Sequence, residues 1–158
     1  MSANAVQGST KNQEMESVLL ELIKTLEDGQ KGFADIGDHL KDLALKRFFL
    51  AESIKRANFR AELENELHRA GMADVKESGT VAGTVRRAWG DLKAKLGGGD
   101  RTLLETAEAG EDEAVRADKD ALQHELPLPI RELLSSQQAQ VIMSHGFVKF
   151  NRDLAVAS

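Results

Sequence analysis

Residues 19–40 read LLELIKTLEDGQKGFADIGDHL, and in this stretch an apolar side chain returns every three or four positions. The stripe consists of Leu19, Leu22, Ile23, Leu26, Phe33, Ile36 and Leu40. This spacing places the apolar side chains on one face of an α-helix, which must then be covered by other helices. Gly29 and Gly32 interrupt the stretch. Because glycine costs a helix about 1 kcal/mol relative to alanine, we expect a close neighbour beside them.

Three further amphipathic segments follow this stretch. Asp42 suits the N-cap of a second helix that ends at Gly71. Asp100 is predicted to cap a third helix, and Pro129 fits the first turn of a fourth. The capping-box spacing at Thr10 predicts that the first helix opens there. We therefore expect residues 1–12 to form a flexible N-terminal tail and residues 13–155 to form one helical domain.

Residues 72–100 separate the second helix from the third. Within them Val81, Val85, Trp89, Leu92 and Leu96 recur at helical spacing, which predicts a shorter helix over residues 80–96, ended by three glycines. Trp89 is expected to pack against the long helices. A long connection between the second and third helices is the ferritin-like one. The sequence thus predicts an all-α, ferritin-like four-helix bundle with a long helical crossover.

Composition narrows the classes of function. The 158 residues include no cysteine, which excludes disulfides and thiolate metal sites and suits the reducing cytoplasm. The net charge of -5 disfavours a nucleic-acid-binding role, including DNA protection, because phosphate binding needs a basic face. No apolar run approaches the roughly 20 residues that a membrane span requires. We therefore expect a cytoplasmic protein that binds neither nucleic acid nor membrane.

Four stretches of the chain carry a family resemblance. They are LEDGQKGF (26–33), RANFRAEL (56–63), SGTVAGTVRRAW (78–89) and GED (110–112). Together they resemble a family of uncharacterised bacterial proteins with a ferritin-like domain of unknown function. The resemblance implies the four-helix bundle with the crossover helix lying along it, and it implies no reaction. The chain differs from the family pattern at Asp118, where an aromatic residue is usual, and at Gln140, where an acid is usual.

Ferritin-like bundles often carry two iron or manganese ions, held by one Glu from each of two helices and Glu-x-x-His from each of the others. No Glu-x-x-His occurs in this sequence. Counting the helical rise of about 1.5 Å per residue from the helix ends nevertheless brings five polar residues to one height. They are Asp28, Glu52, Arg56, Glu111 and His145.

Two interpretations of this polar layer compete. In the first, Glu52, Glu111, His145 and Asp28 ligate iron or manganese. In the second, Arg56 pairs with Asp28 and Glu111, Gly29 and Gly32 leave room for the long Arg56 side chain, and His145 caps the network without a metal. The second is favoured because a buried arginine repels a divalent cation and already neutralises the carboxylates.

The predicted function follows from this choice. The chain offers no complete set of catalytic residues, so we expect a non-catalytic structural or interaction protein. A role in the stress response is one version of this expectation. A homodimer is the expected assembly, and another protein is the alternative partner. The competing hypothesis is a carboxylate and histidine metal-binding protein that stores iron or manganese or acts as an oxidoreductase.

Overall fold

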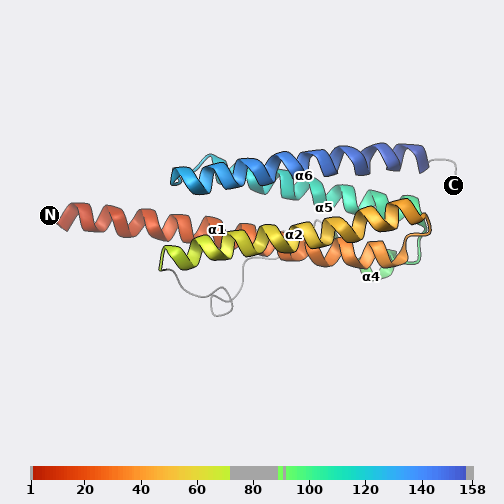
Figure 1. Ribbon diagram of the computed structural model, residues 1–158, viewed down its shortest axis with the longest axis horizontal. Coiled ribbons are helices and arrows are strands. Elements are labelled where there is room, and N and C mark those ends of the chain that lie inside the picture. Colours follow the sequence, from red (N-terminus) through yellow and green to blue (C-terminus); the bar gives the residue numbers. More distant parts are fainter. Residues whose placement is uncertain (1, 72–88, 91, 156–158) are drawn as a thin grey trace.

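The computed structural model describes residues 2–71, 89–90 and 92–155. Its helices are α1 (Ser2–His39), α2 (Leu43–Arg69), α4 (Leu92–Lys95), α5 (Asp100–Leu122) and α6 (Leu128–Leu154), and these residues contain no strand. The four long helices run along the longest axis of the molecule (Figure 1). The predicted all-α class is confirmed.

Helices α1 and α2 form one antiparallel pair, and α5 and α6 form another (Figure 1). The pairs meet mainly through α1 and α5, whereas α2 and α6 touch at few points. Two apolar clusters fill the interior. One includes Leu19 and Leu63, and the other includes Phe33 and Phe49. Along α2, Arg56 falls between the residues of the two clusters, which places it near the middle of the molecule.

Helix α1 begins well before the predicted start. It opens at Ser2, so residues 2–12, which we expected to form a flexible tail, belong to the helix, and the prediction of a start at Thr10 is wrong. Extending an existing helix adds one hydrogen bond for each residue fixed, whereas only the first turn is costly to form. No proline stands in this part of the chain to stop the extension.

Of the two predicted N-caps, Asp42 is confirmed and Asp100 is wrong. Asp42 is the N-cap of α2, and its side chain accepts a hydrogen bond from the backbone N–H of Leu45 at 2.9 Å, as predicted. Asp100 does not cap α5, because Gly99 takes that position with a φ of 90°. The carboxylate of Asp100 instead accepts hydrogen bonds from the backbone N–H groups of Lys41 (2.9 Å) and Asp42 (3.1 Å). It therefore ties the start of α5 to the turn between α1 and α2.

Trp89 is buried, with 7% of its surface exposed, as predicted. Its ring lies edge-on to Phe33, with 5.6 Å between the ring centres. It also occupies the space beside two glycines. A Cβ added at Gly32 would lie 2.6 Å from the indole, and one added at Gly110 would lie 2.3 Å from it. The two glycines thus let the indole lie directly against α1 and α5.

The crossover helix predicted over residues 80–96 falls largely outside the described residues. The described part contains the one-turn helix α4 (Leu92–Lys95), followed by the glycines at 97–99. Pro129 lies in the first turn of α6, as predicted.

Candidate functional site

Arg56 lies in the interior with 1% of its surface exposed, between two carboxylates. Its Nη2 is 2.7 Å from Oε1 of Glu111 and 3.4 Å from Oε2 of Glu52. The guanidinium also lies over the ring of Phe33, with 4.9 Å between Cζ and the ring centre. A buried charge is tolerated only when it is paired in this way. Arg56 is therefore the centre of the candidate site.

The local sequence explains how this group is assembled. Glu52 and Arg56 are four residues apart on α2, so their side chains lie on one helix face. Glu111 reaches them from α5 and is fully buried. Gly29 lies beside Arg56 as predicted, and a Cβ there would be in ordinary contact, 3.9 Å from Nη1. Gly32, which we expected to make room for Arg56 as well, makes room for Trp89 instead.

Further polar side chains surround this group. Asp118, Gln137 and Ser144 are all buried. Gln137 donates a hydrogen bond to the carbonyl oxygen of Phe59 at 3.2 Å, which joins α6 to α2. The sequence signal for Asp118 was its place on the inward face of its helix, one heptad after Glu111. Gln137 and Ser144 carried no such signal, because uncharged polar residues are common on either face of a helix.

Burial alters the acidity of two of these carboxyls. It raises the pKa of Glu111, although the Arg56 charge and the Ser144 side chain act in the opposite direction. Burial likewise raises the pKa of Asp118 to about 7; the Arg56 charge opposes this shift, and the Glu111 charge adds to it. The Arg56 charge thus opposes the effect of burial on both carboxyls.

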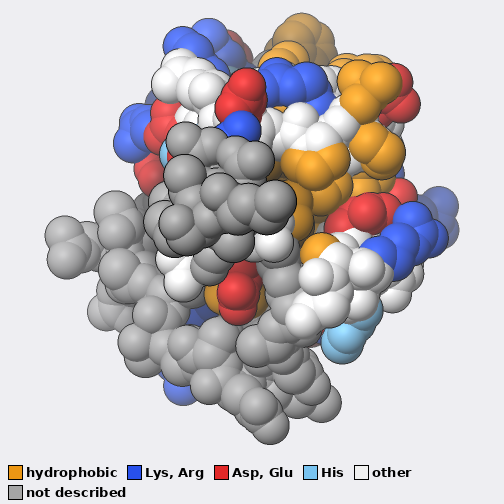
Figure 2. All heavy atoms as spheres, turned by 90° about the vertical axis from the view of Figure 1, so that its left-hand side faces the viewer, with side chains coloured by type: hydrophobic (Ala, Val, Ile, Leu, Met, Phe, Trp, Pro, Cys, Tyr) orange, Lys and Arg blue, Asp and Glu red, His pale blue; other side chains and the backbone are white. Residues whose placement is uncertain are grey.

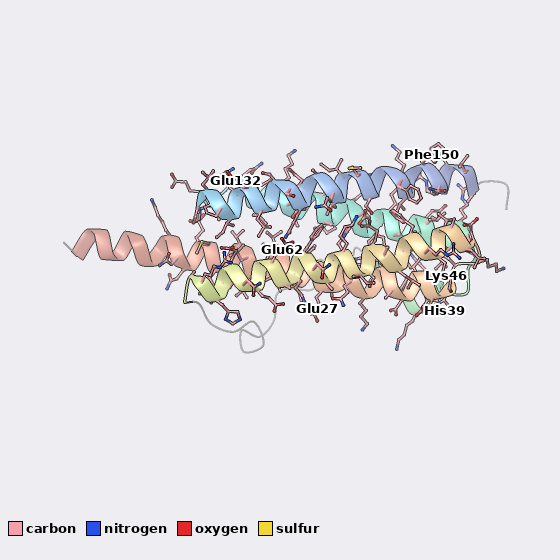
Figure 3. All side chains as sticks on the ribbon, viewed as in Figure 1. Glu27, His39, Lys46, Glu62, Glu132 and Phe150 are labelled. Atoms are coloured by element: carbon pink, nitrogen blue, oxygen red, sulfur yellow. The ribbon has the colours of Figure 1, made fainter. Side chains whose placement is uncertain are left out.

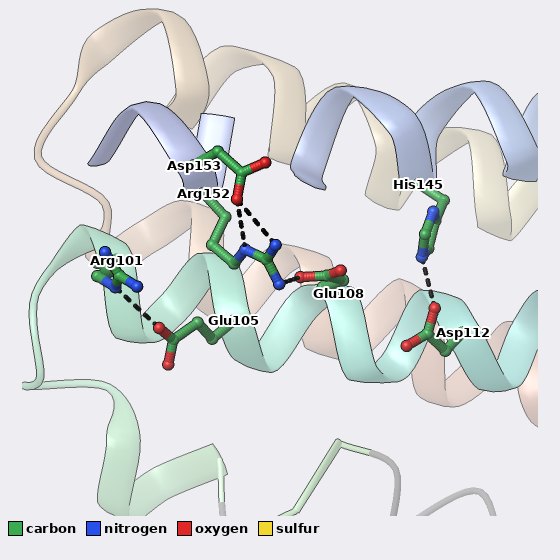
Figure 4. A network of polar contacts seen from close by, with 7 residues as sticks. All are labelled: Arg101, Glu105, Glu108, Asp112, His145, Arg152 and Asp153. Carbon is green, nitrogen blue, oxygen red and sulfur yellow. Dashed lines mark hydrogen bonds and ion pairs between the residues drawn. The ribbon is translucent and has the colours of Figure 1, made fainter. Parts of the chain in front are cut away.

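Two more of the predicted site residues have contacts outside this group. Asp28 lies 3.8 Å from Lys24 on its own helix. His145 is half-buried, and its Nε2 lies 2.5 Å from Oδ1 of Asp112 on α5. Figure 4 shows this contact beside the ion pair between Arg152 and Glu108, which also joins α6 to α5. Across the described residues, no three or more His, Cys, Asp or Glu side chains are grouped in a way that could hold a metal ion.

Comparison with known proteins adds one finding. A family model described as "Domain of unknown function (DUF2383)" matches residues 14–124, which is most of the chain. The chain belongs to this family. A search of the curated proteins gives no match.

The DUF2383 match covers α2, most of α1, and α5, so Glu52, Arg56, Trp89, Glu111 and Asp118 all lie inside it. Helix α6, with His145, lies outside it. A cavity of ≈ 570 Å³ in this DUF2383 protein borders Trp89, and the described residues that line it include both lysines and acids, so these charges favour neither an anion nor a cation. Of the helices described, none is both long and apolar enough to cross a membrane.

Proposed function

We propose that this protein is a ferritin-like four-helix bundle with a long crossover between α2 and α5. We further propose that it serves as a non-catalytic structural or interaction protein. In this proposal, the guanidinium of Arg56 takes the central place in the polar layer that metal ions occupy in metal-carrying bundles. The observation that carries the proposal is the buried contact of 2.7 Å between Arg56 and Glu111.

The hydrogen bonds of Asp100 support the long crossover. They hold the start of α5 at the turn between α1 and α2, which is the end where α2 begins. Helix α2 then runs 27 residues away from this turn before it ends at Arg69. At about 1.5 Å per residue, the chain must return about 40 Å to begin α5. A connection that runs the length of the helices is the one that ferritin-like bundles have.

The donor set supports the non-catalytic role. A two-metal centre in this fold needs carboxylates from four helices and two histidines in Glu-x-x-His motifs, and the sequence has no such motif. Glu111 faces the positive charge of Arg56, and His145 faces Asp112. A divalent cation beside Glu111 would have to approach a buried guanidinium at close range, which is strongly unfavourable. The residues present therefore do not fit a two-metal centre.

The test is the metal content of the purified protein. We expect iron, manganese and zinc well below one ion per chain, both as purified and after incubation with ferrous or manganous salts followed by desalting. The thermal midpoint should be the same with and without a chelator. Near-stoichiometric iron or manganese that is lost in both Glu111→Gln and His145→Ala would overturn the proposal and establish the metal-binding alternative. Glu62→Gln, an exposed change on α2, is the matched control.

A further inference from the structure

The outer face of α6 is unusually apolar. Of the eight large hydrophobic side chains that are exposed among the described residues, six lie on this helix. They are Leu128, Ile142, Met143, Phe147, Phe150 and Leu154. In the end-on view, hydrophobic side chains gather at the upper right, on the side of α6 and α2 (Figure 2). Five of the six lie within residues 142–154. An exposed apolar cluster of this kind marks an interaction site.

The same face carries almost no charge. Residues 133–148 contain no Lys, Arg, Asp or Glu, although these residue types make up 30% of the chain. Over residues 133–148, a charged partner such as a nucleic acid or an acidic peptide would find no Lys, Arg, Asp or Glu to pair with. The face is suited to another uncharged, apolar helix.

Side-chain size changes along this face. Ser135 and Ala139, in the first half of α6, are small and exposed, whereas Met143 and Phe147, in the second half, are large and exposed. If two copies of α6 lie antiparallel, the small half of each faces the large half of the other. One surface then fits itself, as a twofold interface requires.

A register centred on residue 141 satisfies this complementarity. It sets Ala139 opposite Met143, and Leu128 opposite Leu154 at the two ends. It also brings Glu132 of one copy beside Lys149 of the other, and both side chains are exposed. Glu132 and Phe150 project away from the neighbouring helices near opposite ends of α6 (Figure 3).

The available surface is large enough for a specific dimer. Helix α6 has 27 residues, so its outer strip is about 40 Å long and about 12 Å wide. Two such strips bury on the order of 1,000 Å², the lower limit for a specific interface. Met143 and Phe147 also line a cavity of ≈ 380 Å³ between α6 and α2, where the ring of Phe147 packs against that of Phe48 with 4.0 Å between the ring centres. A Cβ added at Gly146 would meet nothing within 4 Å, so a partner helix can come close there.

We propose that a second copy of this chain docks on the outer face of α6, with the two α6 helices antiparallel about a twofold axis near residue 141. This inference rests on the non-catalytic interaction role proposed above and names its partner. The helix lies outside the part of the chain that the DUF2383 family match covers, so family membership does not assign this surface.

Light scattering coupled to size-exclusion chromatography tests the dimer. The protein should have twice the mass of one chain at micromolar concentration. Met143→Glu and Phe150→Glu should each yield monomers with unchanged helical content, because both side chains are exposed within one chain. Leu43→Glu, which changes a side chain that is 68% exposed on α2, should leave the dimer intact. A monomeric parent protein, or a dimer that persists in both α6 variants, would overturn the proposal.

Disulfide trapping tests the orientation. The chain has no cysteine, so an equimolar mixture of Ala139→Cys and Met143→Cys proteins should give the cross-linked heterodimer under mild oxidation. Faster cross-linking of each variant to itself than to the other would indicate a parallel pair and contradict the register. These outcomes do not depend on the metal content, so a failure of this proposal can be separated from a failure of the proposed function.

Discussion

Arg56 and Glu111 meet in the interior of the protein, with 2.7 Å between Nη2 and Oε1, and both side chains are almost completely removed from solvent. Neither could be buried alone. The cost of isolating a charge from water is several kcal/mol, and only the opposite charge offsets it.

Removing the positive partner should therefore be severe. We expect Arg56→Met to lower the free energy of unfolding by about 3–5 kcal/mol, because it leaves Glu111 buried without a counter-charge. Adding Glu111→Gln should restore much of the loss, while Glu52 keeps Lys55 at 3.0 Å. Urea denaturation of both single variants and the double variant measures this coupling.

Arg60→Met is the control for this cycle. Arg60 is on the same helix and pairs with Glu64 at 3.1 Å, but both side chains are about one-third exposed. The change should cost less than about 1 kcal/mol. Strictly additive effects of Arg56→Met and Glu111→Gln would refute the description of the two residues as a mutually dependent pair.

Trp89 makes two glycines indispensable. Gly→Ala in a helix normally adds up to about 1 kcal/mol of stability. We expect Gly32→Ala and Gly110→Ala to be destabilising instead, because each new methyl group would overlap the indole. Gly29→Ala, three residues from Gly32, should be neutral or stabilising, since its nearest neighbour is 3.9 Å away. Thermal unfolding followed by the fluorescence of the single tryptophan gives the comparison.

The Trp89 site also predicts a compensating change. Trp89→Ala should cost about 3–5 kcal/mol by leaving a cavity. In that background Gly110→Ala should no longer be harmful, because the ring that it would strike is gone. Equal damage from Gly110→Ala in both backgrounds, measured by circular dichroism, would show that the glycine is needed for another reason.

Asp118 gives the stability a pH dependence of unusual sign. Its pKa rises from the ordinary value of 3.8 to about 7 in the folded protein. Between these values the folded state holds a proton that the unfolded chain has released. The contribution of Asp118 is therefore fully present below pH 4 and declines as the pH rises toward 7, by up to about 4 kcal/mol.

Asp118→Asn removes this titration while keeping the shape of the protonated acid. We expect the variant to gain stability relative to the parent protein as the pH rises from about 5 to about 8, measured as the difference in urea midpoint. Asp120→Asn, an exposed change on the same helix, should show no such trend. A difference between Asp118→Asn and the parent that stays constant with pH would rule out a proton on Asp118.

The sequence predicted how far along the helices the site lies better than it predicted which way the side chains point around each helix axis. Counting residues from the helix ends was enough to bring Arg56 and Glu111 to one level. It could not tell that His145 turns toward Asp112, since a small change in rotation about the axis of α6 decides which neighbour the ring meets. The sequence also did not predict the need for glycine at position 110. That need comes from Trp89, which a distant segment of the chain places against α5.

Local signals also failed where the partner is distant. Asp100 follows a run of three glycines, so the sequence fits two positions for it: the N-cap of α5, or the first residue after the N-cap. The deciding contacts are the N–H groups of Lys41 and Asp42, about sixty residues earlier along the chain. No periodicity or capping rule reports a contact across that separation. Asp42, whose hydrogen-bond donor is three residues away, was predicted correctly.

The two hydrogen bonds of Asp100 also link the folding of separate parts of the chain. The donors at Lys41 and Asp42 point the same way only when the turn between α1 and α2 has formed. The first turn of α5 is thus stabilised by a hairpin made entirely of earlier residues, and the hairpin is stabilised in return. This reciprocity favours cooperative unfolding, in which the turn and the start of α5 open together rather than fray independently.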